Sequence, residues 1–197
     1  MGLAAEKLEK RCTYGDYLTW TGGERWELID GYAYAMSPAP LTEHQRVERN
    51  LAWAIESHLK GKPCEMLFAP TDVRLPNPPD EPDEEIDTVV QPDILVVCDP
   101  AKIDKKGVRG VPDFIIEILS PSTAKLDFNE KFRLYERSGV REYWIVDPAN
   151  HCIHSYRMEN SGRFSEEVLI SGKSAVAAGA VLEGFSLPLS EVFRMGV

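Results

Sequence analysis

The sequence predicts an α/β (α+β) fold, in which helices flank a mixed sheet and extra β-hairpins are present. Two observations lead to this prediction. Apolar runs of roughly four to eight residues, typical of strands, recur along the chain. Two other segments have the periodicity of amphipathic helices. The expected order of hairpin, helix, three strands, helix, strand and hairpin differs from the regular βα alternation of a doubly wound sheet.

The length of the chain, 197 residues, favours one domain over residues 1–197. No stretch approaches the roughly 18 apolar residues of a membrane span, so we expect no membrane partner. The first 12 residues lack the continuous apolar segment of a signal peptide. The four cysteines (Cys12, Cys64, Cys98 and Cys152) form no CxxC pair, which favours reduced thiols and a cytoplasmic location.

The formal net charge is −10, which discourages non-specific contact with nucleic acid or anionic membranes. Six of the acidic residues lie between positions 80 and 87, after a proline-rich stretch. Clustered like charges repel one another and need water, so we expect residues 76–88 to form an exposed acidic loop rather than a metal cage.

The first elements are a short helix near residues 14–19 and a hairpin over residues 24–36, whose turn is Asp30-Gly31. In that register Glu27 lies opposite Tyr34. A helix follows over residues 42–60, with a capping box formed by Thr42 and Gln45. Its apolar stripe consists of Val47, Leu51, Ile55 and Leu59, and Gly61 and Pro63 end it.

Three extended segments come next, within residues 65–75, 89–99 and 113–120. The second and third are almost continuously apolar, as expected for strands that are covered on both faces. A second helix is predicted over residues 127–138, with a capping box of Asp127 and Glu130 and with Gly139 at its end. A strand over residues 142–148 and a hairpin over residues 152–170 complete the fold.

Two acidic residues occupy positions where an apolar residue would cost less. Glu117 lies inside an apolar strand, and Asp93 begins another. A buried carboxylate needs a cation, a metal or a proton as its partner. Lys131 lies in the apolar stripe of the following helix, so it can fold back over Glu117. The same residues are also typical of a structural ion-pair cluster, so the pattern alone leaves both interpretations open.

A set of motifs resembles the Uma-two family of restriction-endonuclease-like proteins, a former domain of unknown function. The motifs are ELIDG (27–31), QPDILVV (91–97), EILSPST (117–123) and EKFRLYERSGVREYWIVDP (130–148). The resemblance covers about residues 12–192. It implies the PD-(D/E)xK nuclease fold, a restriction-endonuclease-like mixed sheet flanked by helices, and a magnesium-dependent or manganese-dependent endonuclease that acts on DNA.

Carried over by position, the resemblance makes Pro92-Asp93 the PD and Glu117 the (D/E) of the motif. Leu119 stands where the motif has lysine, so the site lysine is expected on the following helix. Lys131 is the natural occupant and Lys125 the rival. Asp93, Glu117 and the carbonyl of Ile118 would hold the metal, and Glu27 would add a catalytic carboxylate. Such a metal activates water and stabilises the charge that develops in phosphodiester cleavage.

Several further residues are candidates for substrate contact. His44 lies at the start of a helix, and Lys105, Lys106 and Arg109 belong to a basic loop. The family also implies a homodimer. The alternative to an enzyme is an inactive module with the nuclease fold that serves in protein interaction or assembly. It predicts that Lys131 saturates the carboxylates.

The histidines near the second hairpin suggest zinc, because His151 and His154 flank Cys152. Positions 151 and 154 face opposite sides of a strand, however, and no second pair of ligands follows. We therefore expect surface histidines.

Overall fold

The computed structural model describes residues 10–21, 23–36 and 41–194. The expectation that no signal peptide begins the chain falls largely on residues 1–9, outside this part. Within it, no helix is both long enough and apolar enough to cross a bilayer. The predicted mixed α+β architecture is confirmed, with two six-stranded sheets and a small two-stranded one.

The central sheet runs in the order β12-β11-β10-β9-β6-β3. Its middle strands β9 and β10 are parallel, and the other neighbours are antiparallel. This sheet is therefore mixed, as the sequence predicts. Its strands are β3 (Glu65–Phe68), β6 (Ile94–Val97), β9 (Phe114–Ile118), β10 (Glu142–Asp147), β11 (Cys152–Arg157) and β12 (Val168–Ser171).

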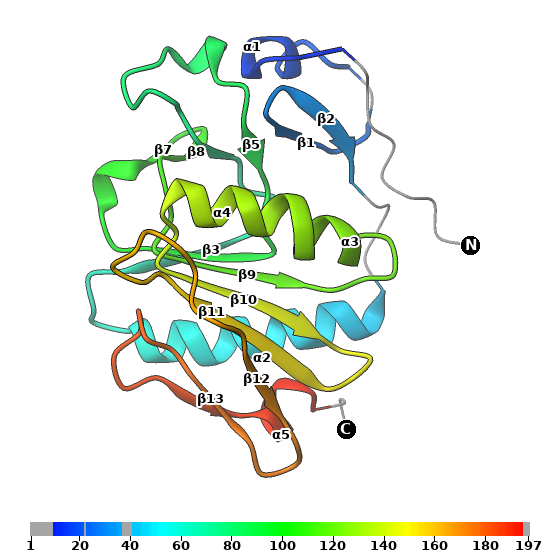
Figure 1. Ribbon diagram of the computed structural model, residues 1–197, viewed down its shortest axis with the longest axis vertical. Coiled ribbons are helices and arrows are strands. Elements are labelled where there is room, and N and C mark those ends of the chain that lie inside the picture. Colours follow the sequence, from blue (N-terminus) through cyan, green and yellow to red (C-terminus); the bar gives the residue numbers. More distant parts are fainter. Residues whose placement is uncertain (1–9, 22, 37–40, 195–197) are drawn as a thin grey trace.

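Helices cover both faces of this sheet (Figure 1). One face packs on α2 (Thr42–Leu59), whose predicted stripe of Val47, Leu51, Ile55 and Leu59 is buried against residues such as Ile116 and Trp144. The other face packs on a continuous helical segment. It comprises α3 (Ala124–Leu126), the π-helical turn η3 (Asp127–Lys131) and α4 (Phe132–Ser138). Leu134 and Tyr135 of α4 lie in the same apolar cluster as Ile115 and Ile145.

The second sheet, ordered β2-β1-β5-β4-β8-β7, lies above the central one in Figure 1. The predicted hairpin is confirmed, because Glu27 pairs with Tyr34 and the turn residues Asp30 and Gly31 have φ values of 52° and 79°. Its strands are β1 (Trp26–Ile29), β2 (Tyr32–Ala35), β4 (Val73–Arg74), β5 (Val89–Val90), β7 (Ile103–Asp104) and β8 (Gly107–Arg109).

Short elements complete the fold around these two sheets. They are α1 (Tyr14–Tyr17), η1 (Asp83–Glu85), η2 (Pro100–Lys102), β13 (Val176–Ala178), β14 (Ser186–Pro188) and α5 (Leu189–Val192). The hairpin predicted over residues 152–170 is present as β11 and β12, with a further bridge between Met158 and Phe164.

Both predicted capping boxes after residue 40 are wrong. Helix α2 begins at Thr42 itself with Leu41 at its N-cap, so Thr42 is already helical. The second helix begins at Ala124, before the predicted start, which places Asp127 inside it with a buried side chain. A capping box depends only on local sequence, whereas the Asp127 side chain is buried in the helical segment, near Lys131.

The prediction that all four thiols are reduced is also wrong. Cys64 and Cys98 form a disulfide. The antiparallel register of β3 and β6 pairs Glu65 with Val97, and its continuation brings the two cysteines directly opposite each other. The other two cysteines, Cys12 and Cys152, are free and buried.

The acidic loop is exposed at its tip, but it is not a freely solvated segment. Asp83, which is 18% exposed, pairs with Arg74, Lys106 and Arg109. Ile86 in the same loop is fully buried. The expectation of a solvated loop therefore fails for Asp83, because basic residues from the β4, β7 and β8 region converge on it.

Candidate active site

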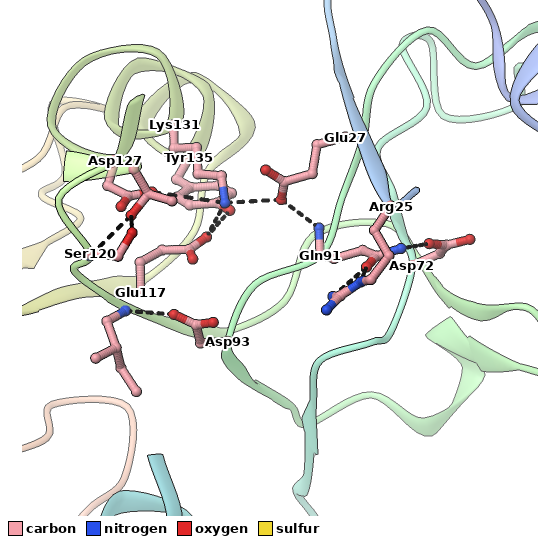
Figure 2. A network of polar contacts seen from close by, with 12 residues as sticks. Arg25, Glu27, Asp72, Gln91, Asp93, Glu117, Ser120, Asp127, Lys131 and Tyr135 are labelled. Carbon is pink, nitrogen blue, oxygen red and sulfur yellow. Dashed lines mark hydrogen bonds and ion pairs between the residues drawn. The ribbon is translucent and has the colours of Figure 1, made fainter. Parts of the chain in front are cut away.

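A buried lysine lies at the centre of the candidate site (Figure 2). Lys131 Nζ is 2.9 Å from Glu117 Oε1 and 2.9 Å from Glu27 Oε1. The hydroxyl of Tyr135, one turn further along the helix, donates to the same Glu117 oxygen at 2.7 Å. The three charged side chains come from the helix, β9 and β1, and each residue is at most 4% exposed.

Glu27 belongs to β1 of the second sheet and reaches this cluster through its ion pair with Lys131. Its Oε1 also accepts the backbone N–H of Gln91 at 2.8 Å. The Gln91 side chain extends the network outward, because it accepts from Arg25 and donates to Asp72 and Tyr17. Glu27 is therefore a buried member of the cluster and not a surface residue of the hairpin.

Asp127 lies on the same helix one wide turn before Lys131. Its Oδ1 is 3.9 Å from Lys131 Nζ and, among the described residues, is a buried oxygen without a hydrogen bond. The five residues Asp127–Lys131 form a π-helical turn. Such turns often mark functional sites, and this one directs both the acid and the lysine toward the sheet.

Asp93 lies beside Glu117 at the start of β6. The register of β6 and β9 pairs Ile94 with Ile116, so its continuation brings Asp93 opposite Glu117. Asp93 Oδ2 accepts the Ile118 N–H at 2.7 Å and lies 3.2 Å from His44 Nε2. His44 Nδ1 is buried and 3.9 Å from Glu48. The structure places His44 against Asp93, and its contact with substrate stays a prediction.

Burial governs the protonation of the cluster. It raises the pKa of Glu117 well above its ordinary range, with Lys131 opposing and the neighbouring carboxylates adding to the effect. Burial likewise raises the pKa of Asp127 to about 7, again against the pull of Lys131. For Lys131, burial alone would lower the pKa, but Glu117, Glu27 and Asp127 outweigh it and raise the pKa. The site therefore holds a fixed ammonium group and exchangeable carboxyl protons.

The oxygens still available fit a hard divalent cation. Among the described residues, the hydrogen bonds of Glu117 go to Oε1 and those of Asp93 go to Oδ2. Glu117 Oε2 and Asp93 Oδ1 are therefore left for a further ligand. Carboxylate and carbonyl oxygens together with water are the ligand set that Mg²⁺ prefers. The two carboxylates alone are fewer ligands than a dedicated protein cage would supply, so water or substrate oxygens would have to complete the shell.

The other predicted residues lie apart from this cluster. The side chain of Lys125 is exposed, so of the two candidate lysines only Lys131 lies at Glu117. Lys106 and Arg109 both pair with Asp83, and Arg109 also donates to two carbonyls of the acidic loop. Lys105 is exposed on the same turn. Substrate contact by these three residues stays a prediction.

Sequence reasoning missed four residues of the site: Asp127, Tyr135, Gln91 and Arg25. Asp127 and Tyr135 stand four residues before and after Lys131, so helical spacing alone places them on the same face. That signal was present in the sequence. Gln91 and Arg25 carry no such signal, because their contact depends on the antiparallel pairing of β1 with β5, which are distant in the sequence.

The chain matches known proteins over most of its length. Residues 14–190 match the model of the Uma2 family, described as "Putative restriction endonuclease". Uncharacterized protein slr1290 of Synechocystis sp. (strain ATCC 27184 / PCC 6803 / Kazusa) is 29% identical over 152 residues, 75% of this chain and 74% of the relative. Uncharacterized protein sll1609 of the same organism is 26% identical over 137 residues, 68% and 72% of the two chains.

The fold also matches a solved structure, a "putative nuclease belonging to DUF820" from Anabaena variabilis ATCC 29413. The TM-score is 0.72 at 19% identity, covering 92% of this chain and 97% of the other. At that identity the match supports the fold alone, while the family model covers almost all of the described residues. The chain therefore belongs to the Uma2 family, in agreement with the motifs around Asp93, Glu117 and Lys131.

Proposed function

We propose that this protein is a metal-dependent endonuclease that hydrolyses phosphodiester bonds in DNA. Asp93 and Glu117 would hold Mg²⁺ or Mn²⁺ with the carbonyl of Ile118. Lys131, Glu27 and Asp127 would tune that centre. Family membership supports the nuclease class, and the geometry of the cluster supports the assignment of the residues.

One observation carries the proposal: the site holds more acid than base. Four carboxyl groups, those of Glu27, Asp93, Glu117 and Asp127, act on one another around the single ammonium group of Lys131. A buried charge without a partner is costly. Protons supply part of the compensation, as the raised pKa of Asp127 indicates. A divalent cation would supply the remainder and displace those protons.

Lys131 is a positioning residue in this account. Its ammonium group fixes Glu117 through Oε1, so that Oε2 faces the space beside Asp93. A bound metal would activate a water molecule and stabilise the negative charge of the transition state. Glu27 holds the lysine from the opposite side and is itself fixed by the Gln91 backbone. The chain thus orients one carboxylate oxygen through a relay of buried contacts.

Substrate phosphate needs a cation that is not already neutralised. Lys106 and Arg109 are paired with Asp83. Arg25 instead donates to the uncharged Gln91 Oε1, at 3.0 Å from Nε and 2.6 Å from Nη2. It forms no ion pair in the part of the chain that the structure describes, and its side chain is exposed. Arg25 is therefore our candidate for a phosphate contact beside the site.

A second candidate function is an inactive module with the nuclease fold that serves in protein interaction. The observation that favours it is the double occupation of Glu117 Oε1 by Lys131 and Tyr135. If these donors fully satisfy the carboxylate, the cluster is structural. Metal affinity separates the two candidates.

The test combines metal binding with cleavage. Calorimetric titration with Mn²⁺ should give binding at millimolar concentration or tighter, and plasmid DNA should be nicked only when Mg²⁺ or Mn²⁺ is present. Glu117→Gln and Asp93→Asn should abolish both signals. Glu130→Gln, which removes a charge next to Lys131 on the helix, is the matched control and should retain both.

Two results would contradict the proposal. Cleavage that survives in both Glu117→Gln and Asp93→Asn would place the chemistry elsewhere. A wild-type protein that binds no Mn²⁺ would support the inactive module, provided that its thermal unfolding shows it to be folded.

A further inference from the structure

A second cluster of potential metal ligands lies at the end of the β10–β11 pair. Asp147, Cys152 and His154 each offer one ligand atom, and these atoms lie within 4.8 Å of one another. Among the residues that the structure describes, this is the one group of three or more His, Cys, Asp or Glu side chains that meets this distance. The site proposed around Glu117 is not such a group.

Strand register explains the convergence. Asp147 pairs with Cys152 across β10 and β11, so both side chains project from the same face of the sheet. His154 is two residues beyond Cys152 and therefore shares that face. The sequence-based argument against zinc compared His151 with His154, which do not share a face. The pair that converges in the structure is instead Cys152 and His154.

The distances suit a tetrahedral ion. Cys152 Sγ is 3.8 Å from His154 Nε2. With zinc bond lengths of about 2.3 Å to sulfur and 2.0–2.1 Å to nitrogen, the tetrahedral angle places these two atoms roughly 3.5 Å apart. A shift of a few tenths of an ångström therefore converts the existing contact into shared coordination. Asp147 would be the third protein ligand, and water the fourth.

Neighbouring side chains also fix the orientation of the ligands. His154 Nδ1 lies 2.7 Å from Glu167 Oε1, so donation from Nδ1 to the carboxylate leaves the Nε2 lone pair directed at Cys152. The Phe128 ring packs edge-on against the imidazole. Asn150 donates to both oxygens of Asp147, at 3.0 and 2.7 Å. A histidine that binds zinc usually donates its other ring N–H to a carboxylate in this way.

The cluster is separate from the acid and lysine site. Ile145 of β10 pairs with Glu117 on one side and with His154 on the other, so two strand spacings, roughly 9.5 Å, separate them. The ligand types differ as well. A thiolate and an imidazole are poor ligands for Mg²⁺ and suit a softer ion.

We propose that Asp147, Cys152 and His154 form a zinc site in this protein. On binding, the Cys152 thiol releases its proton to solvent and the sulfur coordinates the ion. The ion then ties the end of β10 to β11 and, through Glu167, to the segment that precedes β12. This proposal is independent of the nuclease assignment.

The test uses Co²⁺ as a spectroscopic probe for zinc. Titration of the wild-type chain without reductant, which keeps the Cys64–Cys98 disulfide intact, should give a near-ultraviolet thiolate-to-cobalt charge-transfer band that saturates at one equivalent. Added Zn²⁺ should remove the band and Mg²⁺ should not. Cys152→Ser and His154→Gln should lose the band, while Glu167→Gln should weaken Co²⁺ binding about 10–100-fold.

Three control variants leave the proposed ligands in place. Cys12→Ser removes the other free thiol, and His151→Gln removes the neighbouring exposed histidine, and both should keep the band. Glu117→Gln should also keep it, which separates this outcome from that of the nuclease assignment. A wild-type protein with a titratable Cys152 thiol but no band would overturn the proposal, as would a band that survives in a folded Cys152→Ser variant. Should Cys152→Ser fail to fold, an unchanged affinity in Glu167→Gln would overturn it.

Discussion

Replacing Asp127 with asparagine should change how stability depends on pH. In the folded chain the pKa of Asp127 is about 7, because burial disfavours its charge, whereas the ordinary aspartate value is 3.8. The folded state therefore holds a proton that the unfolded chain has released. Below pH 3.8 the aspartate is protonated in both states, so the difference between the two pKa values does not lower stability. Between pH 4 and 7 this difference progressively destabilises the wild type. Asparagine cannot ionise and escapes this cost.

The magnitude follows from the two pKa values. A difference of about three pKa units corresponds to roughly 4 kcal/mol at pH 8, since each unit is worth about 1.4 kcal/mol. At pH 4 the same term is below about 1 kcal/mol. The free energy of unfolding of Asp127→Asn, relative to wild type, should therefore rise by roughly 2–4 kcal/mol between pH 4 and pH 8. Sharing of protons with Glu117 accounts for the lower end of that range.

Urea unfolding at several pH values, in EDTA to exclude metals, measures this difference. Asn129→Ala is the matched control, because it removes an exposed polar side chain of the same helical turn without removing a titratable group. The free energy of unfolding of Asn129→Ala should change with pH in parallel with that of the wild type. A parallel profile for Asp127→Asn as well would refute the protonation account of the cluster.

Four further predictions concern the same region. Lys131→Met should lower the free energy of unfolding by about 3–5 kcal/mol at pH 8, because it leaves buried carboxylates without their cation. The loss should be smaller at pH 5, and an equal loss at the two pH values would contradict this prediction. Mn²⁺ affinity measured by calorimetry should rise from pH 6 to pH 8, because binding must displace the protons that Glu117 and Asp127 hold; a flat profile would contradict it. Burial lowers the pKa of His44, but Asp93 and Glu48 outweigh burial and raise it. The charged imidazole therefore stabilises the fold at low pH, so thermal unfolding should show a larger loss of stability for His44→Gln at pH 6 than at pH 8. Arg25→Gln should weaken DNA binding and flatten its salt dependence while leaving Mn²⁺ affinity unchanged, whereas an unchanged salt slope would remove Arg25 from the substrate path.

Features set by neighbouring residues could be predicted from the sequence. The Asp30-Gly31 turn fixes the hairpin register, which in turn places Glu27 opposite Tyr34. The 3.6-residue period of Val47, Leu51 and Ile55 identifies the buried face of α2. An acid inside an apolar strand identified Glu117, because few other roles justify the cost of burying a carboxylate.

Features that depend on distant contacts were not predictable in the same way. The Cys64–Cys98 disulfide follows from the register of β3 against β6, which no local pattern encodes. The pairing of Asp83 with Lys106 and Arg109 joins two loops that are each unremarkable when considered alone. Asp127 was assigned to a helix cap because its local sequence suits one, although its spacing from Lys131 also suits the buried face.

The central claim is that a divalent ion occupies the space between Asp93 and Glu117. Anomalous diffraction from crystals soaked in Mn²⁺ measures this directly. We expect a manganese peak in contact with Glu117 Oε2 and Asp93 Oδ1, with Lys131 still bound to Glu117 Oε1. Crystals that show no manganese there, with only the lysine ammonium against the carboxylates, would contradict the metal-dependent mechanism and favour a structural ion-pair cluster.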